Sequence, residues 1–157
     1  MIEISIPGKQ EIWQLKYLVL DLNGTLALDG QLLPGVEERI RALSTLLDVY
    51  VLTADTFGTA VTQFRTLPCH LHLLTPEDQV RQKENFVNAL GSQYCVAIGN
   101  GLNDKGMLQA ARLGICITGP EGAATETLAV SDIVIPSVTG AFDLLFHTKR
   151  IKATLRK

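Results

Sequence analysis

The chain has 157 residues, of which 46% are hydrophobic and 19% are charged, and its formal net charge is −2. This length fits one core of ordinary size, so we expect a single domain over residues 1–157. The composition excludes disordered and collagen-like classes, and the small net charge gives no indication of a nucleic-acid partner.

The N-terminal stretch and the cysteines bear on location. No basic region leads into an apolar run near the start, and no apolar run approaches the roughly 18 residues that span a bilayer. We therefore expect a cytoplasmic protein with no membrane partner. The three cysteines are odd in number and far apart, which favours buried free thiols over a disulfide or a metal cluster: Cys69, Cys95 and Cys116.

Short apolar runs alternate with longer segments of helical period along the chain. Residues 2–6 and 11–16 alternate in polarity, which favours a β-hairpin ahead of the core. The predicted strands are 17–22, 48–55, 70–74, 95–101, 114–118 and 132–136. The predicted helices are 34–46, 57–65, 75–90, 103–112, 122–130 and 138–146, and the basic tail 147–157 is expected to be a solvated helix end. This alternation predicts an α/β fold, a three-layer Rossmann-like parallel sheet with helices on both faces.

Polar side chains follow three of the predicted strands where each strand ends. The first strand runs into "DLNGT" (Asp21–Thr25), the second ends in "TAD" (Thr53–Asp55), and the fourth is followed by "GNGLND" (99–104). In a parallel α/β sheet, ligands bind beyond the carboxyl ends of the strands. We therefore expect these residues to meet at one edge, together with Lys83 from the helix that follows the third strand.

These segments resemble the motifs of the haloacid dehalogenase-like (HAD) superfamily of phosphohydrolases, which includes the phosphorylation domain of the P-type ATPases. "DLNGT" is similar to the first motif, D-x-D-G-T, and "VLTAD" to the second in its ATPase version, T-G-D. Lys83 matches the third, and "GNGLND" resembles the fourth, G-D-G-x-N-D. The resemblance covers about Tyr17 to Phe146, with the motifs in family order, and is nearest to a soluble relative of the ATPase domain.

The resemblance implies a role for each matched residue. Asp21 would be the nucleophile that forms an aspartyl-phosphate, Thr53 a donor to the phosphoryl group, and Lys83 the cation that neutralises both. The implied substrate-binding residues are Gly24, Thr25, Ala54, Asp55 and Asn103. The implied cofactor is Mg²⁺, a hard ion that prefers oxygen ligands, held by Asp21, Asn23, Asn100 and Asp104.

Two positions depart from the family pattern. Asn23 stands where the phosphatases have the acid that protonates the leaving group and activates water, and this loss typically costs about 10²- to 10⁴-fold in rate. Asn100 stands where a carboxylate usually meets the metal. Two functions therefore stay open: a Mg²⁺-dependent phosphohydrolase that favours activated phosphates, or a catalytically weakened phosphate- or partner-binding regulatory protein.

The spacing of the motifs leaves no room for a cap domain. The segments from Thr25 to Thr53 and from Asp55 to Lys83 each fit one helix and short strands of the core itself. An open site does not exclude water by itself. We therefore expect either a macromolecular phosphorylated substrate or a homo-oligomer in which a neighbouring subunit covers the site, with the N-terminal hairpin as a candidate contact.

Several of these residues also have simpler explanations. Asp55 is equally well explained as a helix N-cap, and Arg81 lies close enough to Lys83 in sequence to be mistaken for it. His70 and His72 would share one face of a strand and could bind a metal, but without an evident third ligand strand packing or surface exposure is the better interpretation.

Overall fold

Within the described residues the central sheet has six parallel strands, which confirms the predicted α/β fold. The structure is a computed structural model that describes residues 1–54 and 58–157. The strands lie in the order β10 (Ile133–Ile135), β9 (Leu113–Ile117), β8 (Cys95–Gly99), β3 (Tyr17–Asp21), β6 (Asp48–Thr53) and β7 (His70–Leu73). Since every neighbouring pair is parallel, all six carboxyl ends meet at one edge, with β3 among the central strands.

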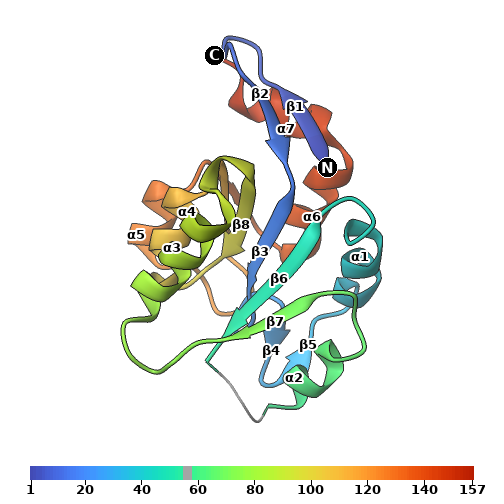
Figure 1. Ribbon diagram of the computed structural model, residues 1–157, viewed down its shortest axis with the longest axis vertical. Helices are drawn as coiled ribbons and strands as arrows, with labels where there is room; N and C mark the ends of the chain where they lie inside the picture. The colour runs from blue at the N-terminus through green and yellow to red at the C-terminus, as the bar shows by residue number, and fades with distance from the viewer. Residues whose placement is uncertain (55–57) are drawn as a thin grey trace.

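Helices cover both faces of this sheet. They are α1 (Val36–Leu43), α2 (Thr59–Phe64), α3 (Gln79–Leu90), α4 (Lys105–Ala110), α5 (Thr125–Val130), α6 (Val138–Phe146) and α7 (Thr148–Leu155), with 3₁₀ turns η1 (Ser92–Tyr94) and η2 (Leu102–Asp104). Figure 1 shows α3, α4 and α5 on one face and α1 and α6 on the other. Along β3, Leu18 and Leu20 join the core under α1 and α6, whereas Val19 joins the core under α3 and α4. The alternation explains why this strand is apolar throughout.

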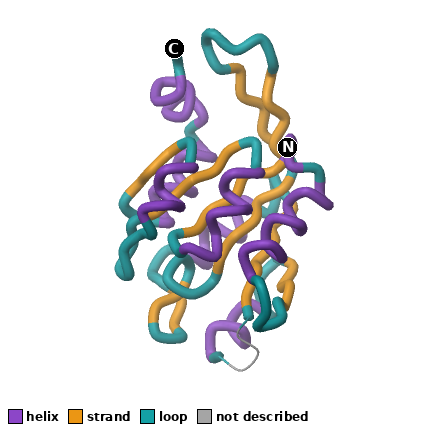
Figure 2. Tube along the Cα trace, turned by 90° about the vertical axis from the view of Figure 1, so that its left-hand side faces the viewer, coloured by secondary structure: helices purple, strands orange, loops and turns teal. Residues whose placement is uncertain are grey.

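Two antiparallel hairpins flank the sheet. The predicted N-terminal hairpin is confirmed as β1 (Ile2–Ser5) and β2 (Ile12–Leu15). It projects from the sheet at the same end as the C-terminal helix α7 (Figure 2). Because β2 leads directly into β3, this is the amino end of the strands. A small hairpin, β4 (Ala27–Leu28) and β5 (Gln31–Leu32), follows the first motif, and no cap domain is evident among the described residues.

Some predicted helix boundaries are wrong, for local reasons. The third predicted helix begins at Gln79 rather than residue 75, because the side chain of Asp78 accepts a hydrogen bond from the backbone N–H of Arg81 at 3.2 Å. Thr75 is instead bonded to the side chain of Gln82. The next two helices are also shorter than predicted: η2 precedes α4, and α5 begins only at Thr125. The predicted start of α2, Phe57, lies outside the described residues.

Other expectations concern isolated residues. Cys95 and Cys116 are buried free thiols, and Cys69 is free and partly buried. His70 stacks on Tyr50 and His72 lies against Phe86. Both histidines are exposed on β7, as expected for packing at the surface of a strand. None of the helices in the described ranges has the length and apolar character needed to cross a membrane.

Candidate active site

The three polar strand ends meet at the carboxyl edge of the sheet. β3 ends at Asp21, and its neighbours β6 and β8 end at Thr53 and Gly99. Asp21 and Thr53 are 6% and 3% exposed, which is unusual for polar side chains. Sheet topology therefore brings together three segments that are far apart in sequence, at the position where α/β folds bind ligands.

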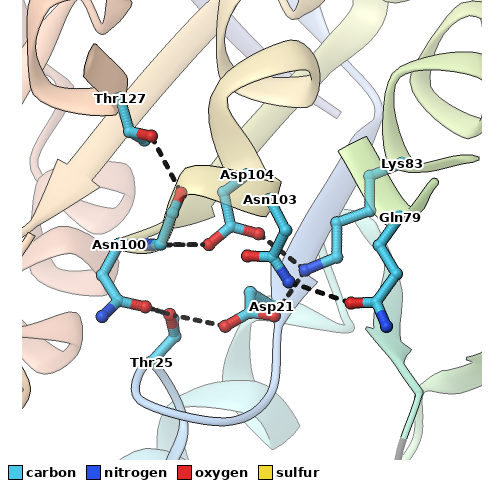
Figure 3. Close-up of polar contacts among 9 residues, drawn as sticks. Asp21, Thr25, Gln79, Lys83, Asn100, Asn103, Asp104 and Thr127 are labelled. Atoms are coloured by element: carbon cyan, nitrogen blue, oxygen red, sulfur yellow. Dashed lines mark hydrogen bonds and ion pairs between the residues drawn. The ribbon is translucent and has the colours of Figure 1, made fainter. Parts of the chain in front are cut away.

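A buried lysine connects two of these segments. The Nζ atom of Lys83, from α3, lies 2.6 Å from Oδ1 of Asp21 and 2.6 Å from Oδ1 of Asp104 (Figure 3). The lysine is 1% exposed. Arg81 is exposed on the same helix and contributes only its backbone to the cap of α3. The geometry thus selects Lys83, and not Arg81, as the cation of this edge.

The cluster of Asp21, Lys83 and Asp104 buries two carboxylates and one ammonium group. Burial and the charge of Asp104 raise the pKa of Asp21 to about 7, although Lys83 acts to lower it. Burial acts to lower the pKa of Lys83, but attraction to Asp21 and Asp104 outweighs it and raises that pKa. The lysine therefore stays protonated, and Asp21 is the group with an energetic reason to take up a proton or a second cation.

Asp104 is engaged on both of its oxygen atoms. Oδ1 accepts from Lys83, and Oδ2 accepts from the backbone N–H groups of Asn100 and Gly101 at 2.9 and 3.0 Å. These bonds close the loop between β8 and α4 around a fully buried carboxylate. Asp104, one of the predicted metal ligands, thus has no oxygen turned away from the protein.

Thr25 connects Asp21 to Asn100. Its hydroxyl group lies 3.1 Å from Oδ2 of Asp21 and 3.2 Å from Oδ1 of Asn100. The residue is fully buried, so its hydroxyl group orients these two side chains. With Lys83 on Oδ1, both oxygens of Asp21 are held in place.

The turn after β3 depends on a glycine. Gly24 has φ of 80°, a left-handed conformation that other residues rarely adopt, and its N–H donates to Ala27 at 2.8 Å. A Cβ atom there would lie 2.3 Å from Oε2 of Glu121 and 3.1 Å from Nδ2 of Asn100. Asn23, just before it, is exposed. The turn therefore packs closely against two other segments of the site.

The remaining predicted residues are placed as follows. Ala54 is exposed directly after β6, and Asp55 lies outside the described residues. The side-chain amide of Asn103 donates to the side chain of Gln79 at 3.1 Å (Figure 3), so it is bonded to α3 and not to Asp104.

Three residues at this edge were not predicted. Gln79 precedes Lys83 by four residues, so the helical period places both on one face of α3. Thr127, on α5, is fully buried and donates to the carbonyl of Gly101 at 2.8 Å. Glu121 follows β9, and its position after a strand end was the available signal. For Thr127 the sequence offered none.

The oxygen atoms of this edge suit a hard divalent cation. Asp21 contributes a carboxylate and Asn100 an amide oxygen, both bonded to Thr25, and the carbonyl of residue 23 belongs to the adjoining turn. Within the ranges 1–54 and 58–157, no three His, Cys, Asp or Glu side chains gather as a metal site. A cation here would thus depend on amide and carbonyl oxygens beside few carboxylates, a donor set that Mg²⁺ accepts.

Comparisons of sequence find relatives of unassigned role. The chain is 51% identical over 61 residues to an uncharacterised protein of Methanocaldococcus jannaschii, matching 39% of this chain and 66% of that protein. A second uncharacterised protein of the same organism is 49% identical over 39 residues, which cover 25% of this chain and 89% of that protein. No protein family model matches the chain.

Comparisons of structure find phosphatases. The 3-deoxy-D-manno-octulosonate 8-phosphate phosphatase of Moraxella catarrhalis, solved with magnesium, phosphate and the sugar KDO, has a TM-score of 0.68 and 20% identity, over 92% of this chain and 95% of that one. A phosphoserine phosphatase, solved as an analogue of its phospho-aspartyl intermediate, has a TM-score of 0.63 and 15% identity, over 84% and 99% of the two chains. At these identities the likeness establishes the shared fold.

Proposed function

We propose that this chain, which has the fold of HAD-superfamily hydrolases, is a divalent-metal-dependent phosphohydrolase that acts through an aspartyl-phosphate at Asp21. The chain belongs to one family with the second M. jannaschii protein. The observation that carries this proposal is the buried Lys83, bonded at 2.6 Å to both Asp21 and Asp104. Burying three charged groups is costly, and a site that must neutralise a phosphoryl group accounts for that cost.

The first half of the reaction uses groups that the structure already orients. The carboxylate of Asp21 attacks phosphorus, the bond to the leaving group breaks, and the phosphoryl group passes to Asp21. Lys83, from α3, is bonded to Asp21, and Thr53 ends the neighbouring strand β6. Both would stabilise the charge on the transferring group. A bound divalent cation would supply additional positive charge beside the phosphoryl oxygens.

The identity of residue 23 supports a preference among substrates. An alkoxide is a poor leaving group without a proton donor, and the amide of Asn23 has no proton to give. Acyl phosphates, aryl phosphates and nucleotide anhydrides leave as stable anions and need only positioning and charge neutralisation. We expect these activated phosphates to exceed a sugar phosphate, such as the 8-phosphate named for the M. catarrhalis enzyme, as substrates.

The same absence affects the second half of the reaction. Without a base at position 23, water attacks the aspartyl-phosphate slowly, as in the P-type ATPases that this chain resembles. A phosphoenzyme should therefore accumulate, visible as a mass gain of about 80 daltons after incubation with acetyl phosphate. Three free cysteines support the cytoplasmic location that we propose for this chemistry.

The cover of the open site is part of the proposal. The N-terminal hairpin lies at the amino end of β3, whereas Asp21 lies at the carboxyl end. The hairpin thus cannot close the site of its own subunit, and any cover of this kind comes from a neighbouring subunit. If no oligomer forms, the open edge fits a phosphate presented on a macromolecule.

A second candidate function is a phosphate- or partner-binding protein that retains the fold without turnover. Asn23 and Asn100 favour it, because both stand at positions where the family has acids. The two functions differ in what they predict for the metal-loaded site: the enzyme turns over activated phosphates, whereas the binding protein holds a phosphate analogue and releases no product.

The test is hydrolysis of acetyl phosphate, para-nitrophenyl phosphate and ATP with Mg²⁺ by wild type and Asp21→Asn. Asp48→Asn is the matched control, because Asp48 is an exposed carboxylate at the opposite end of β6. We expect turnover by wild type and Asp48→Asn and none by Asp21→Asn. Turnover that survives in Asp21→Asn would refute the proposal, and binding of beryllium fluoride without turnover would favour the second candidate.

A further inference from the structure

The loop between β9 and α5 packs directly on the turn that follows the nucleophile position. A Cβ atom on Gly119 would lie 3.3 Å from the carbonyl oxygen of Gly24, and one on Gly24 would lie 2.3 Å from Oε2 of Glu121. Glu121 therefore brings its carboxylate into contact with the same turn that carries Asn23. The side chain is otherwise exposed, and it takes part in none of the ion pairs formed among the described residues.

Asn100 holds this loop in place. Its Nδ2 atom donates to the carbonyl of Gly122 at 2.9 Å, and its own backbone carbonyl accepts from the N–H of Ala124 at 2.9 Å. Its Oδ1 atom faces Thr25. An aspartate at this position would set a carboxylate oxygen against the carbonyl oxygen of Gly122, two acceptors without a proton between them. The amide at position 100 is thus a specific requirement of the loop that carries Glu121.

The two side chains share one location. Oε2 of Glu121 and Nδ2 of Asn100 both lie near the position that a Cβ atom on Gly24 would take, at 2.3 and 3.1 Å. Asn100 is in turn joined to Asp21 through the hydroxyl of Thr25. Asn100 lacks the negative charge that a divalent cation prefers in its ligands. Glu121 supplies a carboxylate within contact of the same glycine.

We propose that Glu121 is a ligand of the divalent cation and replaces the carboxylate that position 100 lacks, while the amide of Asn100 anchors its loop. The inference rests on the proposed function, since it assumes a cation at this edge. Glu121 is exposed and forms none of the ion pairs among the described residues, whereas Asp104 is bound on both oxygens by Lys83 and the backbone.

The test is a titration of wild type and Glu121→Gln with Mn²⁺, in which electron paramagnetic resonance measures the concentration of the free ion. We expect Glu121→Gln to weaken Mn²⁺ binding at least about tenfold, a loss usual when a group that supports a metal is removed. Glu126→Gln is the control, because it removes the same charge from nearby α5, where Glu126 pairs with Lys105 at 2.8 Å. Thermal melting of each variant checks that the fold is retained.

A second variant separates ligation from general structure. Glu121→Asp keeps a carboxylate on the loop, and we expect it to retain more Mn²⁺ affinity than Glu121→Gln. Equal binding by Glu121→Gln and wild type, equal weakening in Glu126→Gln, or equal weakening in Glu121→Asp and Glu121→Gln would each overturn the inference. A different result would refute the proposed function, namely turnover that survives in Asp21→Asn. Unchanged Mn²⁺ affinity in Glu121→Gln would overturn only the inference about Glu121 and would leave the proposed function standing.

Discussion

Replacing Asp21 with asparagine should stabilise the metal-free protein at neutral and alkaline pH. Burial and the charge of Asp104 raise the pKa of Asp21 from 3.8 to about 7, and each unit corresponds to about 1.36 kcal/mol. A raised carboxyl pKa contributes stability that is complete below about pH 4 and is lost as the pH rises through about 7. At about pH 8 the ionised Asp21 therefore lowers the free energy of unfolding by at most about 4 kcal/mol. The Asp21→Asn substitution removes this penalty, and the new amide oxygen can still accept a hydrogen bond from Lys83.

The assay is thermal unfolding of wild type and Asp21→Asn in a metal chelator from pH 5 to pH 8. At about 2–4 °C per kcal/mol for a chain of this size, the variant should melt several degrees higher at pH 8, with a gap that shrinks toward pH 5. The control Asp48→Asn should stay within about 0.5 kcal/mol of wild type, since it alters an exposed site. If Asp21→Asn is less stable at pH 8, or its advantage does not change with pH, the argument from buried charge is wrong.

Three further predictions concern the same edge. Lys83→Met leaves Asp21 and Asp104 buried without a cation, so it should lower the free energy of unfolding by about 3–5 kcal/mol in urea titrations. Adding Asp21→Asn should recover part of this loss. An unchanged urea midpoint in Lys83→Met would contradict the prediction. Asn23→Asp should raise kcat/KM for an alkyl phosphate by about 10²-fold or more and change acetyl phosphate turnover much less; equal effects on both would contradict this interpretation of Asn23. Gly24→Ala should cost about 1–2 kcal/mol, because its φ is 80°, and should displace Glu121 and weaken Mn²⁺ binding; retained affinity would argue against that contact.

The sequence was sufficient for the sheet and for the residues at its strand ends. Apolar runs on a central strand, such as Leu18–Leu20, indicate burial on both faces, and residues that follow such strands must meet at one edge. The closing helix has the predicted limits, Val138–Phe146, because Ser137 caps it with a bond to Gly140 at 3.1 Å. Local chemistry and strand order thus determine most of the fold.

The parts that could not be predicted depend on contacts between distant loops. The first turn of α3 follows Asp78, which caps the helix, and not Thr75 and the proline after it. The sequence could not decide between these positions, because more than one residue there could cap a helix. The inward orientation of Asp104 follows from its bonds to Lys83 and to two amides of its own loop. Thr127 and Glu121 reach the site because α5 and the loop before it contact the segments that follow β8 and β3, at Gly101 and Gly24.

The charge of the buried cluster of Asp21, Lys83 and Asp104 explains why a further carboxylate lies at Glu121 and not at position 100. Lys83 faces two carboxylates, and the pKa of Asp21 is already raised by burial and by Asp104. An aspartate at position 100, where Asn100 is 6% exposed, would add another buried negative charge beside them and make the metal-free fold still less stable. Glu121 is exposed, so it carries its charge at little desolvation cost. On the proposal that Glu121 binds the cation, the site keeps its negative charge for the metal while the folded protein avoids burying it when the metal is absent.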